Sequence, residues 1–170
     1  IIDNFATSEK SSLDAFNEIN IIEGNIENQK TVNDAFNNFK PDIVIHSAAS
    51  YKDPLDWESD SKSNILGSLN ISQASEKFEV KQIINFQTSL CYGNPKKIPI
   101  PVDHVLQPFT SYGISKTAGE KILLNSFVPI ISLRLANICA PGLSIGPIPT
   151  FYKRLKNNYT LLWDMPSNDG

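Results

Sequence analysis

A tyrosine and a lysine one helical turn apart are the residues of this chain whose types and spacing best suit chemistry. In the stretch SYGISKTAGEKILL, Tyr112 precedes Lys116 by four positions. Residues at i and i+4 of a helix share one face, so the ammonium of Lys116 can act on the surroundings of the phenol. A tyrosine has a pKa of about 10, and a close buried cation lowers it toward working pH. Such a phenol could pass a proton to or from a sugar or alcohol oxygen, unless Tyr112 only packs and Lys116 is only solvated.

The composition is that of a globular domain without a nucleic-acid or membrane partner. The chain has 170 residues, of which 41% are apolar, and this is enough to fill a core. The net charge is −3 and the basic residues are scattered, so no surface for a polyanion is expected. No apolar run approaches the roughly 20 residues of a spanning helix, and no signal peptide is seen. Cys91 and Cys139 close apolar runs, as reduced buried thiols do, and we expect a cytoplasmic protein.

Short apolar runs alternate with helical patterns along the chain. We expect the end of a strand at Ile1 and Ile2, strands in 19–24, 42–50, 82–89 and 129–137, and helices in 31–39, 57–78 and 111–126. Continuous apolar runs are typical of strands that are buried on both faces, and their alternation with helices indicates a parallel sheet. The pattern therefore predicts a doubly wound α/β sheet.

The glycines do not form a phosphate-binding turn. A nucleotide-binding fold is expected to begin with a strand and a glycine-rich turn, yet the eight glycines offer no G-x-x-G-x-x-G or G-x-G-x-x-G spacing. Both ends of the chain look cut. We therefore expect a fragment that lacks the first strand and the glycine-rich turn, and that is inactive by itself.

Six short segments at the ends of the expected strands carry a family resemblance. They are DNF, GNI, HSAAS, QTSLCYG, YGISK and RLANICAPG, and they fall where an open α/β sheet binds its ligands. Their order resembles the extended short-chain dehydrogenase/reductase family, in its nucleotide-sugar epimerase/dehydratase branch, over essentially the whole chain. The stretches HSAASYKDP and GPIPTFYKRL are similar to NAD-dependent epimerases of bacterial lipopolysaccharide O-antigen clusters.

The resemblance implies a Rossmann-like fold and NAD as the cofactor. Residues 1–135 would form a partial NAD-binding domain, and 136–170 the beginning of a small substrate-binding lobe. Asp3, unless it is only a solvated loop carboxylate, would accept hydrogen bonds from the adenosine ribose, and its charge would repel the 2′-phosphate of NADP. Asn25 stands where the family usually has aspartate, and its amide could meet the adenine edge beside the backbone of Ile26.

Small residues and one asparagine complete the expected cofactor site. Ala48, Ala49 and Ser50 leave space for a pyrophosphate and a ribose, although small residues also serve close helix packing. Asn64 matches an asparagine whose amide ties the long helix to the cofactor side in the family; the alternative is an ordinary exposed helix residue. We interpret His46 as a hydrogen-bonded structural residue, because the family assigns it no chemistry.

The resemblance also assigns a catalytic triad. Thr88 would position the sugar oxygen, Tyr112 would move its proton, and Lys116 would lower the pKa of the phenol while holding the nicotinamide ribose. Related dehydratases place aspartate and glutamate directly after this threonine, and here Ser89 and Leu90 follow it. Leucine cannot transfer a proton, so epimerisation is favoured over elimination of water.

Substrate contacts are expected from residues on both sides of the predicted boundary. Ser89 and Asn137 are assigned to the nucleotide sugar, Asn137 through its diphosphate, and Phe151 could flank it. We assign no metal ligands. The expected activity is NAD-dependent C4 epimerisation of a UDP-hexose through a transient 4-keto sugar, in a protein that forms a homodimer when full length. The alternatives are a dehydratase, decarboxylase or reductase on the same scaffold, and a catalytically silent NAD-binding protein.

Overall fold

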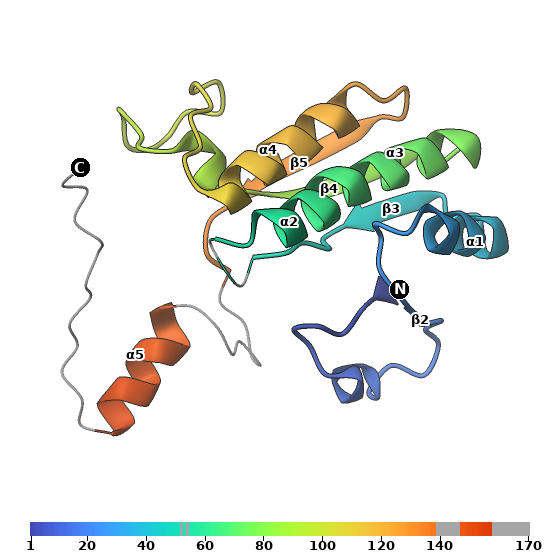
Figure 1. Ribbon diagram of the computed structural model, residues 1–170, viewed down its shortest axis with the longest axis horizontal. Coiled ribbons are helices and arrows are strands. Elements are labelled where there is room, and N and C mark those ends of the chain that lie inside the picture. The colour runs from blue at the N-terminus through green and yellow to red at the C-terminus, as the bar shows by residue number, and fades with distance from the viewer. Residues whose placement is uncertain (52, 54, 139–146, 158–170) are drawn as a thin grey trace. The chain divides into compact units, whose positions relative to one another are not determined.

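The chain divides into two compact units, Ile1–Leu135 and Ala136–Gly170. The computed structural model describes residues 1–51, 53, 55–138 and 147–157 (Figure 1). Within these residues all strands lie in the first unit. Cys139 lies outside the described residues, whereas Cys91 is buried and free, as expected for a reduced thiol.

The strands of the first unit form two parallel sheets. They are β1 (Ile2–Asp3), β2 (Ile22–Glu23), β3 (Ile43–His46), β4 (Gln82–Thr88) and β5 (Ile130–Leu135). β1 pairs with β2, and β4 lies between β3 and β5. The predicted α/β class with parallel pairing is confirmed. The described strands do not form one continuous sheet, since β1 and β3 belong to separate sheets.

The helices of the first unit lie close to their predicted positions. They are α1 (Gln29–Phe39), α2 (Trp57–Asp60), α3 (Gly67–Lys77) and α4 (Ser111–Leu124). A π-helical segment, Ser61–Leu66, joins α2 to α3, so the long helix predicted over 57–78 is interrupted by one wider turn. The Asn28 side chain accepts hydrogen bonds from two backbone N–H groups of α1, and Thr110 accepts one from Gly113 at the start of α4. Two short 3₁₀ helices, Lys10–Leu13 and Ser89–Tyr92, were not predicted.

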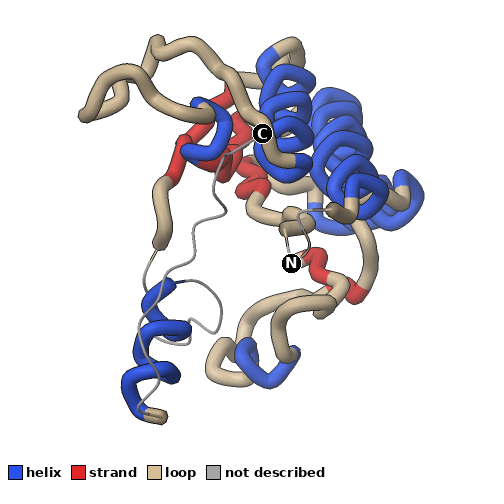
Figure 2. The backbone as a smooth tube through the Cα atoms, turned by 60° about the vertical axis from the view of Figure 1, so that its left-hand side comes forward, coloured by secondary structure: helices blue, strands red, loops and turns tan. Residues whose placement is uncertain are grey.

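The helices pack on one face of the β3–β4–β5 sheet. Helix α1 packs against α3, α3 against α4, and α3 and α4 contact the strands (Figures 1 and 2). The core on this face comprises Ile26, Val32, Phe36, Ile71, Ala74, Val80, Ile83, Leu123 and Val128. On the other face of β3, Ile43 is 54% exposed and Ile45 61%. No described helix of the first unit packs on these side chains, so a doubly wound sheet that is covered on both faces stays a prediction.

The second unit is described only in part. It contains α5 (Pro147–Lys156), a helix that the sequence did not predict. The role of 136–170 as the beginning of a substrate-binding lobe stays a prediction. No helix in the described part of either unit is both long enough and apolar enough to cross a bilayer.

Candidate functional site

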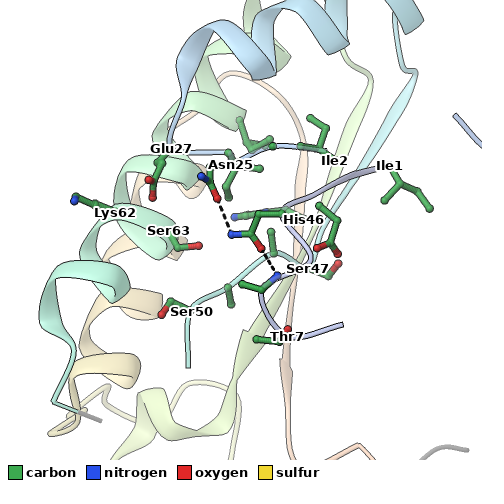
Figure 3. A pocket seen from close by; sticks show the side chains of 18 of the residues that line it. Ile1, Ile2, Thr7, Asn25, Glu27, His46, Ser47, Ser50, Lys62 and Ser63 are labelled. Carbon is green, nitrogen blue, oxygen red and sulfur yellow. Dashed lines mark hydrogen bonds between the residues drawn. The ribbon is translucent and has the colours of Figure 1, made fainter. Parts of the chain in front are cut away.

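A cavity of about 1040 Å³ lies beside the carboxyl ends of β1, β2 and β3. Figure 3 shows Asn25, His46, Ser47 and Ser50 around it. Six residues that the sequence assigns to the cofactor line this cavity: Asp3, Asn25, Ile26, Ala48, Ala49 and Ser50. Its volume lies just above the range for ligand pockets, about 300–1,000 Å³, because it also includes space along the exposed side chains of Ile43 and Ile45 on β3. The fold thus brings together residues from three strand ends that are far apart in the chain.

Asn4 is a residue of this cavity that the sequence analysis missed. Its Oδ1 accepts a hydrogen bond from the backbone N–H of Ala6 at 3.0 Å, and its Nδ2 donates to Oδ1 of Asn25 at 2.6 Å. Because a backbone N–H can only donate, the contact with Ala6 decides which atom of the Asn4 amide is the oxygen. The contact with Asn4 then turns the oxygen of Asn25 toward β1. Asp3 is oriented next to them, since its Oδ1 accepts from the N–H of Phe5 at 2.7 Å.

Asn64 joins the loop after β3 to helix α4. Its Oδ1 accepts from the Ser50 N–H at 3.0 Å, and its Nδ2 donates to the Ser50 carbonyl at 3.1 Å and to Ser115 Oγ at 2.9 Å. The side chain lies in the π-helical segment and is only 1% exposed, so it is not an ordinary surface residue. π-Helical turns often occur at functional sites. The three hydrogen bonds fix one wall of the cavity to the helix that carries Tyr112 and Lys116.

The three predicted catalytic residues come from β4 and α4. Thr88 is the last residue of β4, Tyr112 is the second residue of α4, and Lys116 is buried one turn later. Tyr51 lines the cavity, and its ring meets the Tyr112 ring edge-on with centroids 6.4 Å apart. Tyr112 therefore lies next to the cavity. The Thr88 hydroxyl accepts from the Leu90 N–H at 3.2 Å and so begins the 3₁₀ helix after β4.

The expected effect of Lys116 on the phenol needs correction. The pKa of Tyr112 is raised, not lowered, because burial disfavours the phenolate and the charge of Asp60 opposes it further. Asp60 is almost fully buried and accepts a hydrogen bond from Ser111 Oγ at 2.6 Å. Burial also lowers the pKa of Lys116 to about 8, although the charge of Glu120 favours the ammonium. The phenol is thus held protonated in this structure.

His46 has the structural role that the sequence indicated. Its Nε2 lies 3.0 Å from Ser68 Oγ, and this hydroxyl donates to the Asn64 carbonyl at 2.7 Å. Burial, together with the positive charge of Lys116, lowers the pKa of His46 to about 3. The ring is therefore neutral and links β3 to Ser68 of α3.

A buried polar network behind α4 was not predicted. Glu120 is one turn beyond Lys116, and its carboxylate accepts from Arg134 at 3.2 and 3.3 Å and from Ser132 Oγ at 2.6 Å. Burial raises the pKa of Glu120, but the hydrogen bonds from Ser132, Arg134 and Gln87 outweigh it and hold the pKa below its ordinary value. The spacing of Lys116 and Glu120 was a signal for this network, but the partners on β4 and β5 were not visible in the sequence.

The remaining predicted substrate residues belong to two different units. Ser89 is half-buried and Leu90 is exposed in the 3₁₀ helix after Thr88. Asn137 is exposed and belongs to the second unit, as does the half-buried Phe151 of α5. The contacts of Ser89, Asn137 and Phe151 with a substrate stay predictions.

Comparison with known proteins decides the family. The pattern of the NAD dependent epimerase/dehydratase family matches residues 1–164. The chain belongs to the NAD-dependent epimerase/dehydratase family. NAD is therefore its cofactor, and the α/β fold is the Rossmann-type fold of epimerases.

Members of the epimerase/dehydratase family resemble the chain in sequence and in structure. A UDP-glucose 4-epimerase of Lacticaseibacillus casei is 30% identical over an alignment of 158 positions, and the match covers 86% of this chain and 46% of that protein. The Bordetella bronchiseptica enzyme WbmG, solved in complex with NAD and with NAD and UDP, is 53% identical with a TM-score of 0.89; the match covers 94% of this chain and 51% of WbmG. The structure of a Thermotoga maritima UDP-glucose 4-epimerase with UDP-glucose is 26% identical, with a TM-score of 0.83. The match covers 96% of this chain and 57% of that protein. The chain spans about half the length of these relatives.

Proposed function

We propose that this chain is the cofactor-binding part of an NAD-dependent nucleotide-sugar epimerase that acts at C4 of a UDP-hexose through a transient 4-keto sugar. The observation that supports the proposal is that Thr88 ends β4, that Tyr112 and Lys116 lie in the first turns of α4, and that the Tyr112 ring meets Tyr51 of the cavity wall. The relatives named UDP-glucose 4-epimerase support the same reaction class.

The cavity suits a dinucleotide. The Asp3 carboxylate at the end of β1 would bind the adenosine ribose, and the amide of Asn25 would meet the adenine edge, with the backbone of Ile26 beside the ring. The small side chains of Ala48 and Ala49 let backbone approach the pyrophosphate, next to a Ser50 backbone that Asn64 holds in place. When bound, NAD supplies the reversible hydride acceptor for the reaction.

The three catalytic side chains handle the proton of the sugar hydroxyl. Thr88 would hold the sugar oxygen by a hydrogen bond, and Tyr112 would exchange the proton with it. Because burial and Asp60 raise the pKa of Tyr112, the phenol is ready to donate to a keto oxygen. Removing a proton from the alcohol requires the pKa of the phenol to fall when the site fills, and Lys116 supplies the positive charge on the same helix face.

Epimerisation is favoured over elimination by the residues that follow Thr88. Elimination of water needs a base for the C5 proton and an acid for the departing hydroxyl. Ser89 and Leu90 stand at these positions, and the exposed Leu90 side chain cannot transfer a proton. A silent NAD-binding protein would have no need to keep Thr88, Tyr112 and Lys116 together.

The test is turnover by a protein of the relatives' full length that contains this chain. It is incubated with UDP-glucose, UDP-galactose and their N-acetyl and uronate forms, and the products are separated by chromatography. Interconversion of two sugars without net NADH supports the proposal. Net NADH, or a product lighter by one water, would indicate a reductase or a dehydratase. Bound NAD without any turnover would indicate a silent binder.

A further inference from the structure

Gln87 connects the strand that ends in Thr88 to the helix that carries Tyr112 and Lys116. Its side chain lies on the helix-covered face of β4 and is 3% exposed. Its Oε1 accepts from the Thr88 N–H at 2.8 Å, and its Nε2 donates to the Lys116 carbonyl at 2.9 Å. A single planar amide thus holds the backbone of both residues.

The orientation of the Gln87 amide is decided by its partners. A backbone N–H only donates and a carbonyl only accepts, so the oxygen must face Thr88 and the nitrogen must face Lys116. Both ends of the amide are therefore used, which suits a buried polar group. The neighbouring Glu120 carboxylate on α4 binds Arg134 on β5.

The link is specific to the two elements that must converge. Gln87 supplies a side-chain hydrogen bond from β4 to α4, whereas Glu120 joins α4 to Ser132 and Arg134 of β5. The Thr88 hydroxyl and the Tyr112 phenol approach one sugar oxygen from different elements. An error of about 1 Å in such an arrangement costs on the order of a hundredfold in rate.

We propose that Gln87 is a positioning residue of the reaction, which sets the distance between Thr88 and the helical turn that carries Tyr112 and Lys116. The inference rests on the proposed function. Gln87 is buried and does not line the cavity, so it would act through the backbone of Thr88 and Lys116. The competing explanation is that Gln87 only stabilises the fold as a buried, satisfied amide.

The first experiment compares two variants of an active protein that contains this chain and is as long as its relatives. Gln87→Met keeps the length of the side chain but removes both hydrogen bonds. We expect kcat to fall by at least about tenfold while KM for the sugar changes by less than about threefold. The control is Asn85→Leu, because Asn85 lies on the same face of β4, is 2% exposed and binds only Ser132 Oγ among the side chains of the described residues. It should lower the melting temperature comparably and leave kcat within about twofold.

A double-mutant cycle separates positioning from mere stability. If Gln87 acts through Thr88, then Gln87→Met should cost less than about threefold in kcat when Thr88 is already alanine. An equal loss in both backgrounds, or a kcat of Gln87→Met within about twofold of the wild type, would overturn the inference. Wild-type turnover is measured first, so failure of the proposed function is seen separately.

Hydrogen exchange gives a readout that needs no turnover. The Thr88 amide proton is hydrogen-bonded to Gln87 and should exchange slowly. In Gln87→Met it should exchange at least about tenfold faster relative to the Phe86 amide, and in Asn85→Leu this ratio should not change. Equal ratios in all three proteins would show that Gln87 does not hold Thr88.

Discussion

The phenolic oxygen of Tyr112 is the atom on which the proposed chemistry depends. Tyr112→Phe removes only this oxygen, so the fold and NAD binding should be kept. General acid and base groups contribute about 10²- to 10⁴-fold, and we expect a loss of kcat in this range. The loss of kcat is measured by steady-state kinetics in a protein that contains this chain and is as long as its relatives. Circular dichroism and NAD titration are the controls. A loss under about tenfold would contradict the role of Tyr112.

The lowered pKa of Lys116 predicts how kcat/KM depends on pH. Burial lowers its pKa to about 8, so the ammonium is present below this pH and is lost as the pH rises through it. If the charged form is needed, kcat/KM should fall above about pH 8. Lys116→Arg keeps the charge at higher pH and should remove this alkaline limb even if the absolute rate is lower. If kcat/KM of Lys116→Arg still fell above about pH 8, the group that titrates there would not be Lys116.

Between elements, the close approach of α4 to the π-helical segment depends on Gly119. A Cβ built at this position would lie 2.3 Å from the Asn64 carbonyl oxygen and 2.7 Å from Ser68 Oγ. Gly119→Ala must therefore push the two helices apart, and we expect a loss of about 1–3 kcal/mol in the free energy of unfolding. The same shift should weaken the hydrogen bonds of Asn64 to Ser50 and lower NAD affinity.

Urea denaturation of a protein that contains this chain and is as long as its relatives checks this prediction. The matched control is Lys121→Ala, two residues further along α4, where the side chain is exposed. It should change the free energy of unfolding by no more than about 0.5 kcal/mol. If Gly119→Ala were as mild as this control, the two elements would not be in the close contact described above.

In the whole molecule, the cavity borders apolar surface that the described residues leave uncovered. Ile43 and Ile45 on β3 are exposed, β1 and β3 belong to separate sheets, and the chain has no glycine-rich spacing for a pyrophosphate. We expect that the 170 residues alone tend to aggregate and bind NAD with a dissociation constant above the micromolar range. A protein that contains this chain and is as long as its relatives should bind NAD. Calorimetric titration of NAD into both proteins measures this. Micromolar binding to the chain alone, as a soluble monomer, would contradict the expectation.

Local patterns in the sequence were enough to predict the strands and the longer helices of the first unit. The spacing of Tyr112 and Lys116 predicted a shared helix face, and α4 begins at Ser111. The apolar runs predicted β3, β4 and β5, and small residues after β3 lie at the cavity. These features depend on residues within a turn or a strand of each other, so periodicity and spacing carry them.

Only the tertiary structure decided how these groups act on one another. The pKa of Tyr112 is raised first by burial and then by the charge of Asp60, 52 positions earlier in the chain, and the i,i+4 spacing contains neither. The roles of Gln87 and Asn4 were not predicted because each role is visible only from a partner that is distant in the sequence. Gln87 binds Lys116 on another element, and Asn4 binds Asn25 after another strand. Hydrogen bonds and electrostatic shifts depend on distance in space, and folding alone sets that distance.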